Sequence, residues 1–110
     1  MPATFIQDGD SLDYTPGADV AAGAVVVQND LVGVSKRAIP ANTLGSLAVT
    51  GVFDFPKSTA GGSAIGAGVT VYWNVAGQQA TATSAGNKLL GKTTKAAADA
   101  DATVRVRLSQ

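Results

Sequence analysis

The sequence predicts an all-β protein, a small single-domain sandwich or barrel-like fold of short strands with little helix. The chain contains 13 glycines in 110 residues, and its eight acidic residues are all aspartate, which favours turns and caps over helix surfaces. Stretches of alternating apolar and polar residues recur along it at roughly regular spacing. The length suits one domain over residues 1–110. Because aromatic residues make up only 5%, we expect a core built mainly from Val, Ala, Leu and Ile.

The first half of the chain predicts a short strand and a hairpin. Residues 1–7 are uncharged and mildly apolar, so we expect them to form either a first strand or an N-terminal arm. A short extended piece at 11–15 follows, between turn formers. The apolar runs 24–27 and 31–35 flank Gln28-Asn29-Asp30, and two β-branched runs joined by a few turn formers predict a β-hairpin.

The second half carries the clearest strand patterns. Segments 47–55 and 69–75 alternate with period 2, and each predicts one strand. In the first of these, one face is expected to carry Leu47, Val49, Gly51, Phe53 and Phe55. The polar segment 76–86 predicts a hairpin-like connection, and 96–102 predicts a loop or at most two helical turns. Segment 103–108 predicts a last strand with its valines and leucine inward and its two arginines outward.

Composition excludes several kinds of chemistry. The chain has no Cys and no His, so disulfides, Cys/His zinc sites and Ser-His-Asp or Cys-His catalysis are impossible. Eight basic residues balance eight acidic ones, and a neutral chain lacks the positive field that drives nucleic-acid binding. We expect no catalytic, cofactor or metal site. No stretch resembles a signal peptide or is apolar for long enough to span a membrane, so we expect no membrane partner.

One motif, in contrast, resembles a nucleotide-binding site. Gly86–Thr93 reads GNKLLGKT, which satisfies the letters of the phosphate-binding P-loop, G-x-x-x-x-G-K-[ST]. A P-loop requires a buried apolar strand before it and a helix after it, whose N-terminal amides bind phosphate. Here the preceding stretch is polar, and only residues 94–110 follow, too few for the remaining units of such a fold. We therefore expect Leu89 and Leu90 to be inward residues of a late strand, Gly91 to be a close-packing or bulge position, and no nucleotide to bind.

A second motif is acidic. Asp8, Asp10 and Asp13 in DGDSLD resemble the start of a calcium-binding loop. Leu12 stands at the fifth position, where a ligand is needed, and Asp19 stands at the twelfth in place of glutamate. Turn formation is therefore the expected role of these aspartates.

Two further pairs of residues are candidate contact sites. Lys36 and Arg37 can contact an anionic partner, but a solvated loop pair is the simpler interpretation. Tyr72 and Trp73 are adjacent on a predicted strand, so they face opposite sides. One of them is expected in the core, and the other at an interface or on a sugar-stacking surface. An alternative function is therefore a small carbohydrate- or ligand-binding β module that uses one of them as a stacking platform.

The order of motifs along almost the whole chain resembles the tailed-phage capsid cement, or head decoration, proteins. That family was long catalogued as a domain of unknown function, and some members are mislabelled as RecA/RadA-type recombinases. The most specific pieces are Asp13-Tyr14-Thr15, the stretch from Ala22-Gly23 to Val32-Gly33-Val34, Gly51-Val52-Phe53 with Pro56-Lys57, and Tyr72-Trp73-Asn74.

This resemblance implies a β-tulip-like structural protein without enzymatic activity. For the alternative function, it implies a carbohydrate- or ligand-binding β module of a phage tail or fibre. It implies a homotrimer on the outer surface of the phage capsid, made in the bacterial host cytoplasm and added to the head after expansion. The partner would be the major capsid protein, where neighbouring hexamers meet. A terminal arm in related proteins can add a strand to a capsid edge, and here that arm would be Pro2, Ala3, Thr4, Phe5 and Ile6.

Overall fold

The computed structural model describes residues 3–4 and 9–109, and these residues form strands, turns and loops with no helix. This confirms the all-β prediction. The described chain therefore contains no helix that could cross a membrane. The strands are β1 (Ser11–Tyr14), β2 (Val25–Gln28), β3 (Leu31–Val34), β4 (Gly45–Ala48), β5 (Gly51–Pro56), β6 (Thr70–Asn74), β7 (Gln79–Thr81), β8 (Lys88–Thr93) and β9 (Thr103–Leu108).

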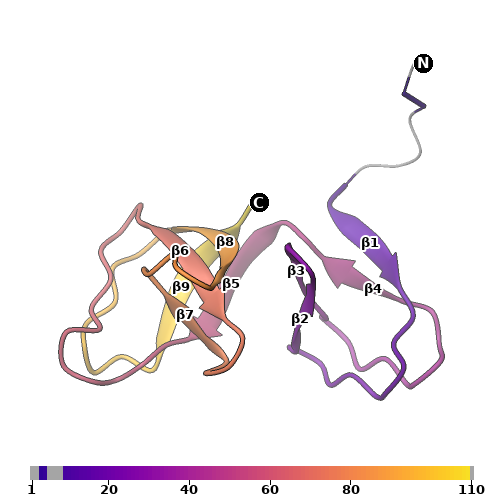
Figure 1. The fold of residues 1–110 in the computed structure, drawn as a ribbon, viewed down its shortest axis with the longest axis horizontal. Coiled ribbons are helices and arrows are strands. Elements are labelled where there is room, and N and C mark those ends of the chain that lie inside the picture. Colours follow the sequence, from indigo (N-terminus) through magenta and orange to yellow (C-terminus); the bar gives the residue numbers. More distant parts are fainter. Residues whose placement is uncertain (1–2, 5–8, 110) are drawn as a thin grey trace.

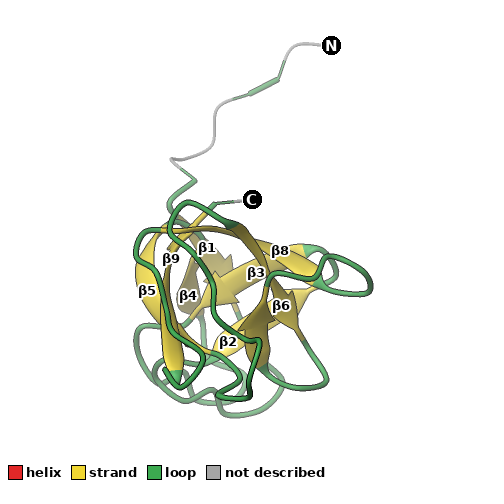
Figure 2. Ribbon diagram, turned by 90° about the vertical axis from the view of Figure 1, so that its left-hand side faces the viewer, coloured by secondary structure: helices red, strands yellow, loops and turns green. Residues whose placement is uncertain are grey.

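The strands form two antiparallel sheets that lie next to each other (Figure 1). The first sheet has the order β1-β4-β3-β2, and we call it and its loops, residues 9–50, the N-terminal lobe. The second has the order β5-β9-β8-β6-β7. A bridge between Lys57 and Ala80 brings β7 back to the end of β5, so this sheet curls into a nearly closed barrel over residues 51–109 (Figure 2).

The predicted strand 47–55 is wrong in one respect, because it is two strands in two different sheets. β4 ends at Ala48, and β5 begins at Gly51 after a two-residue break. Gly51 has a φ of 120°, a backbone conformation that side chains disfavour and glycine accepts, so the chain can turn here from the N-terminal lobe into the barrel. Within β5 the expected alternation is confirmed, since Phe55 is buried and Val52 and Asp54 are exposed.

Other expectations are mostly confirmed. The hairpin is β2–β3, with Asn29 at a φ of 54° in its two-residue turn. Segment 96–102 is a loop, and β6 and β9 alternate as predicted, although Val75 lies beyond the end of β6 and is exposed.

The prediction that Leu89 points inward is wrong, because β8 carries a bulge. Val71 faces Gly91 and Tyr72 faces Leu89, so Leu90 is the extra residue that turns into the core, while Leu89 turns outward.

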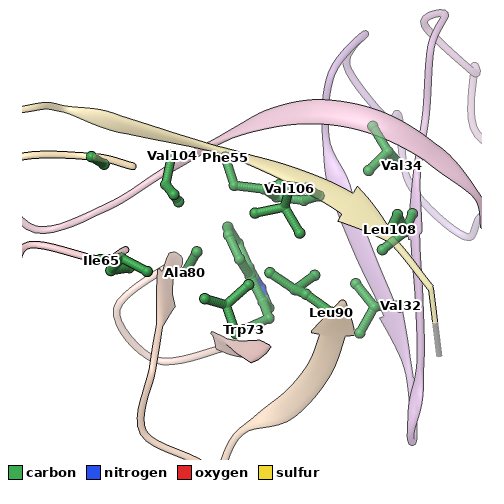
Figure 3. Close-up of a cluster of buried hydrophobic side chains, with 12 residues drawn as sticks. Val32, Val34, Phe55, Ile65, Trp73, Ala80, Leu90, Val104, Val106 and Leu108 are labelled. Carbon is green, nitrogen blue, oxygen red and sulfur yellow. The ribbon is translucent and has the colours of Figure 1, made fainter. Parts of the chain in front are cut away.

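One hydrophobic cluster spans both sheets (Figure 3). Trp73 lies at its centre, 2% exposed, with its ring edge-on to Phe55 at a centroid distance of 6.0 Å. Val32 and Val34 of β3 reach the same cluster beside Leu108 of β9. The N-terminal lobe and the barrel therefore share buried apolar surface, which is the main attraction that holds them together.

Candidate interaction surface

The P-loop-like segment is a turn followed by strand β8, and the hydroxyl and amide of its Thr93 are hydrogen-bonded to the chain just before β6. The hydroxyl of Thr93 donates to the carbonyl of Gly66 at 2.6 Å and accepts from the amide of Val69 at 3.0 Å. The amide of Thr93 donates to the Val69 carbonyl at 2.9 Å. These groups are not arranged as the loop and helix N-terminus that hold a phosphate. That no nucleotide binds stays a prediction.

Gly91 is a close-packing position, as expected. A side chain there would run into the backbone carbonyl of Arg107 on β9, the neighbouring strand. The glycine in the motif is therefore explained by strand packing beside the bulge.

The described part of the DGDSLD motif is a turn and the edge strand β1. Asp10 accepts a hydrogen bond from the Thr50 hydroxyl at 3.3 Å, and Asp13 lies exposed on β1. Asp8 lies outside the described residues. Among the described residues no three acidic side chains come together to hold a metal ion.

Tyr72 and Trp73 face opposite sides of β6, as predicted. Trp73 is the core residue, and Tyr72 is half-buried on the outer side, paired across the sheet with Leu89. A single half-buried tyrosine offers little of the flat aromatic platform that stacks on sugars, so nothing in the described surface favours the carbohydrate-binding alternative.

A buried lysine that the sequence analysis missed ties two long loops together. Lys57 is 4% exposed, and its loops, 57–69 and 94–102, run side by side at one end of the barrel (Figure 1). Its ammonium group donates to the carbonyls of Ser58 (2.7 Å), Ala98 (2.9 Å), Asp101 (3.0 Å) and Asp99 (3.2 Å) and to the hydroxyl of Ser63 (3.3 Å). Hydrogen bonds from a charged donor are stronger than neutral ones, so this end of the barrel is held firmly.

Asp99 reinforces the same pair of loops. Its carboxylate accepts a hydrogen bond from the amide of Ala64 at 2.7 Å. That bond, a further one from the amide of Gly62 and the charge of Lys57 hold the pKa of Asp99 below its ordinary value of 3.8. The loops therefore form a rigid tip at the end of the barrel farther from the N-terminal lobe.

The outer side of the barrel carries a pair of cations that have no ion-pair partner among residues 3–4 and 9–109. Lys92 of β8 lies directly opposite Arg107 of β9, both exposed, and Leu89 and Thr70 lie beside them. Together with Gly91 and Ser109 these residues line a shallow hollow of about 260 Å³, which we call the cationic cleft. β5 lies on the other side of β9 from β8. Its Val52 pairs with Arg107 and is 56% exposed. Exposed apolar side chains around a pair of charges are typical of protein-binding surfaces.

The next pair of outward-facing charged residues on the same sheet, Asp54 and Arg105, carries opposite charges that neutralise each other. Arg105 donates from Nε to Asp54 at 3.0 Å, and a second nitrogen reaches the other carboxylate oxygen at 3.3 Å. This bidentate contact lowers the pKa of Asp54 and raises that of Arg105. Asp54 is thus engaged with Arg105.

A wider cleft of about 540 Å³ lies on the N-terminal lobe. Lys36 and Arg37 lie along it with Asp13, and Leu44, 66% exposed, is at its side. The buried hydroxyl of Ser35 donates to the carbonyl of Arg37, which fixes the turn that presents the two basic residues. The pair is exposed, as the solvated-loop interpretation expects.

The expected N-terminal arm is described only in part. Ala3 and Thr4 are exposed and outside any strand, and Pro2, Phe5 and Ile6 lie outside the described residues. The chain then enters β1, the edge strand of the first sheet. The role of the arm stays a prediction.

Comparison with known proteins gives a match over nearly the whole chain. A family model described as phage cement protein matches residues 6–108, which include every strand of both sheets. No curated protein and no solved structure was found to match the chain.

Proposed function

This chain belongs to the phage cement protein family, and from that premise we propose that it binds the outer surface of the major capsid lattice as a homotrimer and stabilises the expanded head. The family membership makes it a structural protein associated with the phage capsid and located in the virion. The trimer, the expanded head as its target and the stabilising effect are the parts that we propose. Synthesis in the cytoplasm of the bacterial host, before addition to the head, belongs to the same proposal.

The extent of the family match carries this proposal. Residues 6–108 contain both sheets and the cluster that joins them. The nine strands of the described residues all lie within the matched region, and we infer that the function depends on the surface of this fold.

The surface suits a protein that acts by contact. Leu44, Val52, Val75 and Leu89 are large apolar side chains that stay between 39% and 66% exposed. Each gains free energy when it is buried against a partner, at about 25 cal/mol per Å² of apolar area. A weak contact of this kind is sufficient when many copies bind one shell, because multivalent attachment multiplies the effect.

The arm is a proposed capsid contact. β1 is an edge strand, and the segment before it, Pro2, Ala3, Thr4, Phe5 and Ile6, carries no charge. An uncharged extended segment can add a strand to a sheet edge of a partner through main-chain hydrogen bonds. We propose this mode of binding for the arm. We also propose that the protein has no catalytic activity.

Co-sedimentation with phage heads tests the proposal. Purified protein is mixed with expanded, undecorated heads and, as a matched control, with unexpanded heads of the same phage. We expect saturable binding to the expanded heads only, and a trimer mass by light scattering. Protein that stays in the supernatant with expanded heads would refute the proposal.

A variant with residues 2–6 replaced by a Gly/Ser segment of equal length tests the arm separately. We expect it to bind the expanded heads more weakly than the wild type. Equal binding would remove the arm from the proposal and leave the remainder intact.

A further inference from the structure

The two halves of the molecule carry opposite formal charge. Residues 1–50 contain five aspartates and two basic side chains, whereas residues 51–110 contain three aspartates and six basic side chains. The formal charges are therefore −3 and +3, although the whole chain is neutral. The boundary falls at the break between β4 and β5. The N-terminal lobe itself, residues 9–50, contains four of the five aspartates and both basic side chains, so its formal side-chain charge is −2.

Two of the six basic side chains of the barrel lie together on its outer side without an ion pair in the described part of the chain, and Lys95 lies apart from them in the loop before β9. Lys57 is surrounded by carbonyl groups, Lys88 pairs with Asp30 at 2.9 Å, and Arg105 pairs with Asp54. Lys92 and Arg107 are the directly opposed pair of β8 and β9, and among the described residues neither has an ion-pair partner. Like charges directly opposite each other destabilise a sheet. A carboxylate of another molecule that binds between Lys92 and Arg107 offsets the free-energy cost of this repulsion.

Aspartates of the N-terminal lobe are available for that role. Asp10 and Asp13 are exposed at the edge strand β1, and Asp10 has one long hydrogen bond, to Thr50. Asp13 shares its cleft with Lys36 and Arg37 but forms no ion pair with either in the described part of the chain. Asp19 and Asp30 are already engaged, with the amide of Ala41 and with Lys88.

We propose that the cationic cleft of one copy binds Asp13 of β1 and Asp10 in the turn before β1 of the next copy, so that a second copy of this chain is the partner of the barrel's outer side. The inference deepens the proposed homotrimer, on which it rests, by naming its contact. Two different surfaces meet in this contact, so it is heterologous and closes into a ring when the rotation between copies allows. A three-membered ring then satisfies every cationic cleft with carboxylates.

Charge reversal tests this contact in the intact protein. The association constant is measured by sedimentation equilibrium for wild type, for K92E/R107E and for D10K/D13K. Each double variant is expected to associate roughly tenfold more weakly or worse, because like charges then meet at the contact. Combining all four substitutions restores attraction with the signs exchanged, and association is expected to recover to near the wild-type value. Added salt should weaken the wild-type association.

Two controls keep the result interpretable. Lys95→Glu changes the net charge by the same amount as Arg107→Glu at an exposed loop position that does not line the cationic cleft, and it should leave association intact. Arg107→Glu alone places opposite charges across β8 and β9, so the diluted monomer should melt at or above the wild-type temperature while its association falls. A loss of association without a loss of melting temperature excludes misfolding.

The outcomes separate this inference from the proposed function. If K92E/R107E still forms the trimer, or if the fourfold variant does not recover, the contact is refuted while the cement function stands. If the wild type neither associates nor binds expanded heads, the proposed function itself is refuted.

Discussion

The ammonium nitrogen of Lys57 lies 2.9 Å from the carbonyl oxygen of Ala98, 41 residues further along the chain. Lys57 is the first residue after β5, and Ala98 belongs to the loop before β9, so one side chain closes the tip of the barrel. Five oxygen atoms share this one cation.

Replacing this lysine should be costly. In Lys57→Met the carbonyl groups lose their charged donor, and hydrogen bonds to charged groups contribute more than neutral ones. We expect the free energy of unfolding, measured by urea denaturation, to fall by about 3 kcal/mol. Lys95→Met removes an exposed lysine from the loop before β9 and should change stability by less than about 0.5 kcal/mol. Similar values for both variants would show that the buried tie contributes little.

Gly91→Ala tests the close approach of β8 and β9. The added methyl group meets the Arg107 carbonyl, and the strands can accommodate it only by moving apart. We expect a loss of about 2 kcal/mol or more in the free energy of unfolding. The matched control is Gly17→Ala, because a side chain at Gly17 meets nothing within 4 Å and its φ is not positive. A harmless Gly91→Ala would contradict the packing described for the bulge.

The hydrogen bonds that the Asp99 carboxylate accepts from the neighbouring loop predict that its contribution to stability depends on pH. Its pKa in the folded protein is below the ordinary value of 3.8, so its contribution to stability is complete above that value and is lost as the pH falls through the folded pKa. Asp99→Asn should therefore melt at a lower temperature than the wild type at pH 7. The gap should narrow as the pH is lowered below about 4. Melting curves from pH 7 to pH 2 check this, and a gap independent of pH would contradict it.

We expect the P-loop-like segment not to bind nucleotide, and the melting temperature with and without Mg-ATP tests this directly. Because the Thr93 hydroxyl and amide are bonded to Gly66 and Val69, we expect Mg-ATP to leave the melting temperature unchanged. Lys92→Ala should behave in the same way as the wild type. A rise in melting temperature with Mg-ATP that disappears in Lys92→Ala would restore the nucleotide-binding hypothesis.

Much of the fold could be predicted because period-2 patterns and turn residues are local signals. β6, β9 and the β2–β3 hairpin follow directly from them. The break between Ala48 and Gly51 could not be found this way, since alternation continues on both sides of it although the two strands belong to different sheets. The outward turn of Leu89 also escaped prediction, because the bulge that causes it is defined only by pairing with β6.

The candidate surface was less predictable than the fold. Lys57 reads as an ordinary lysine after Pro56, and its role depends on carbonyl groups more than 40 residues away. The opposition of Lys92 and Arg107 depends on strand register, which the sequence does not state. The sequence does show an excess of basic residues in the second half of the chain, and this signal could have pointed to a cationic surface there.

We propose that this chain acts as a structural component of the capsid exterior. A cryo-EM map of the phage particle that encodes it tests this most directly. We predict density for three copies of the two-lobed fold on the outside of the expanded head, where neighbouring hexamers of the major capsid protein meet. A map in which the head surface is bare, or in which this fold is found only in the tail, would contradict the account.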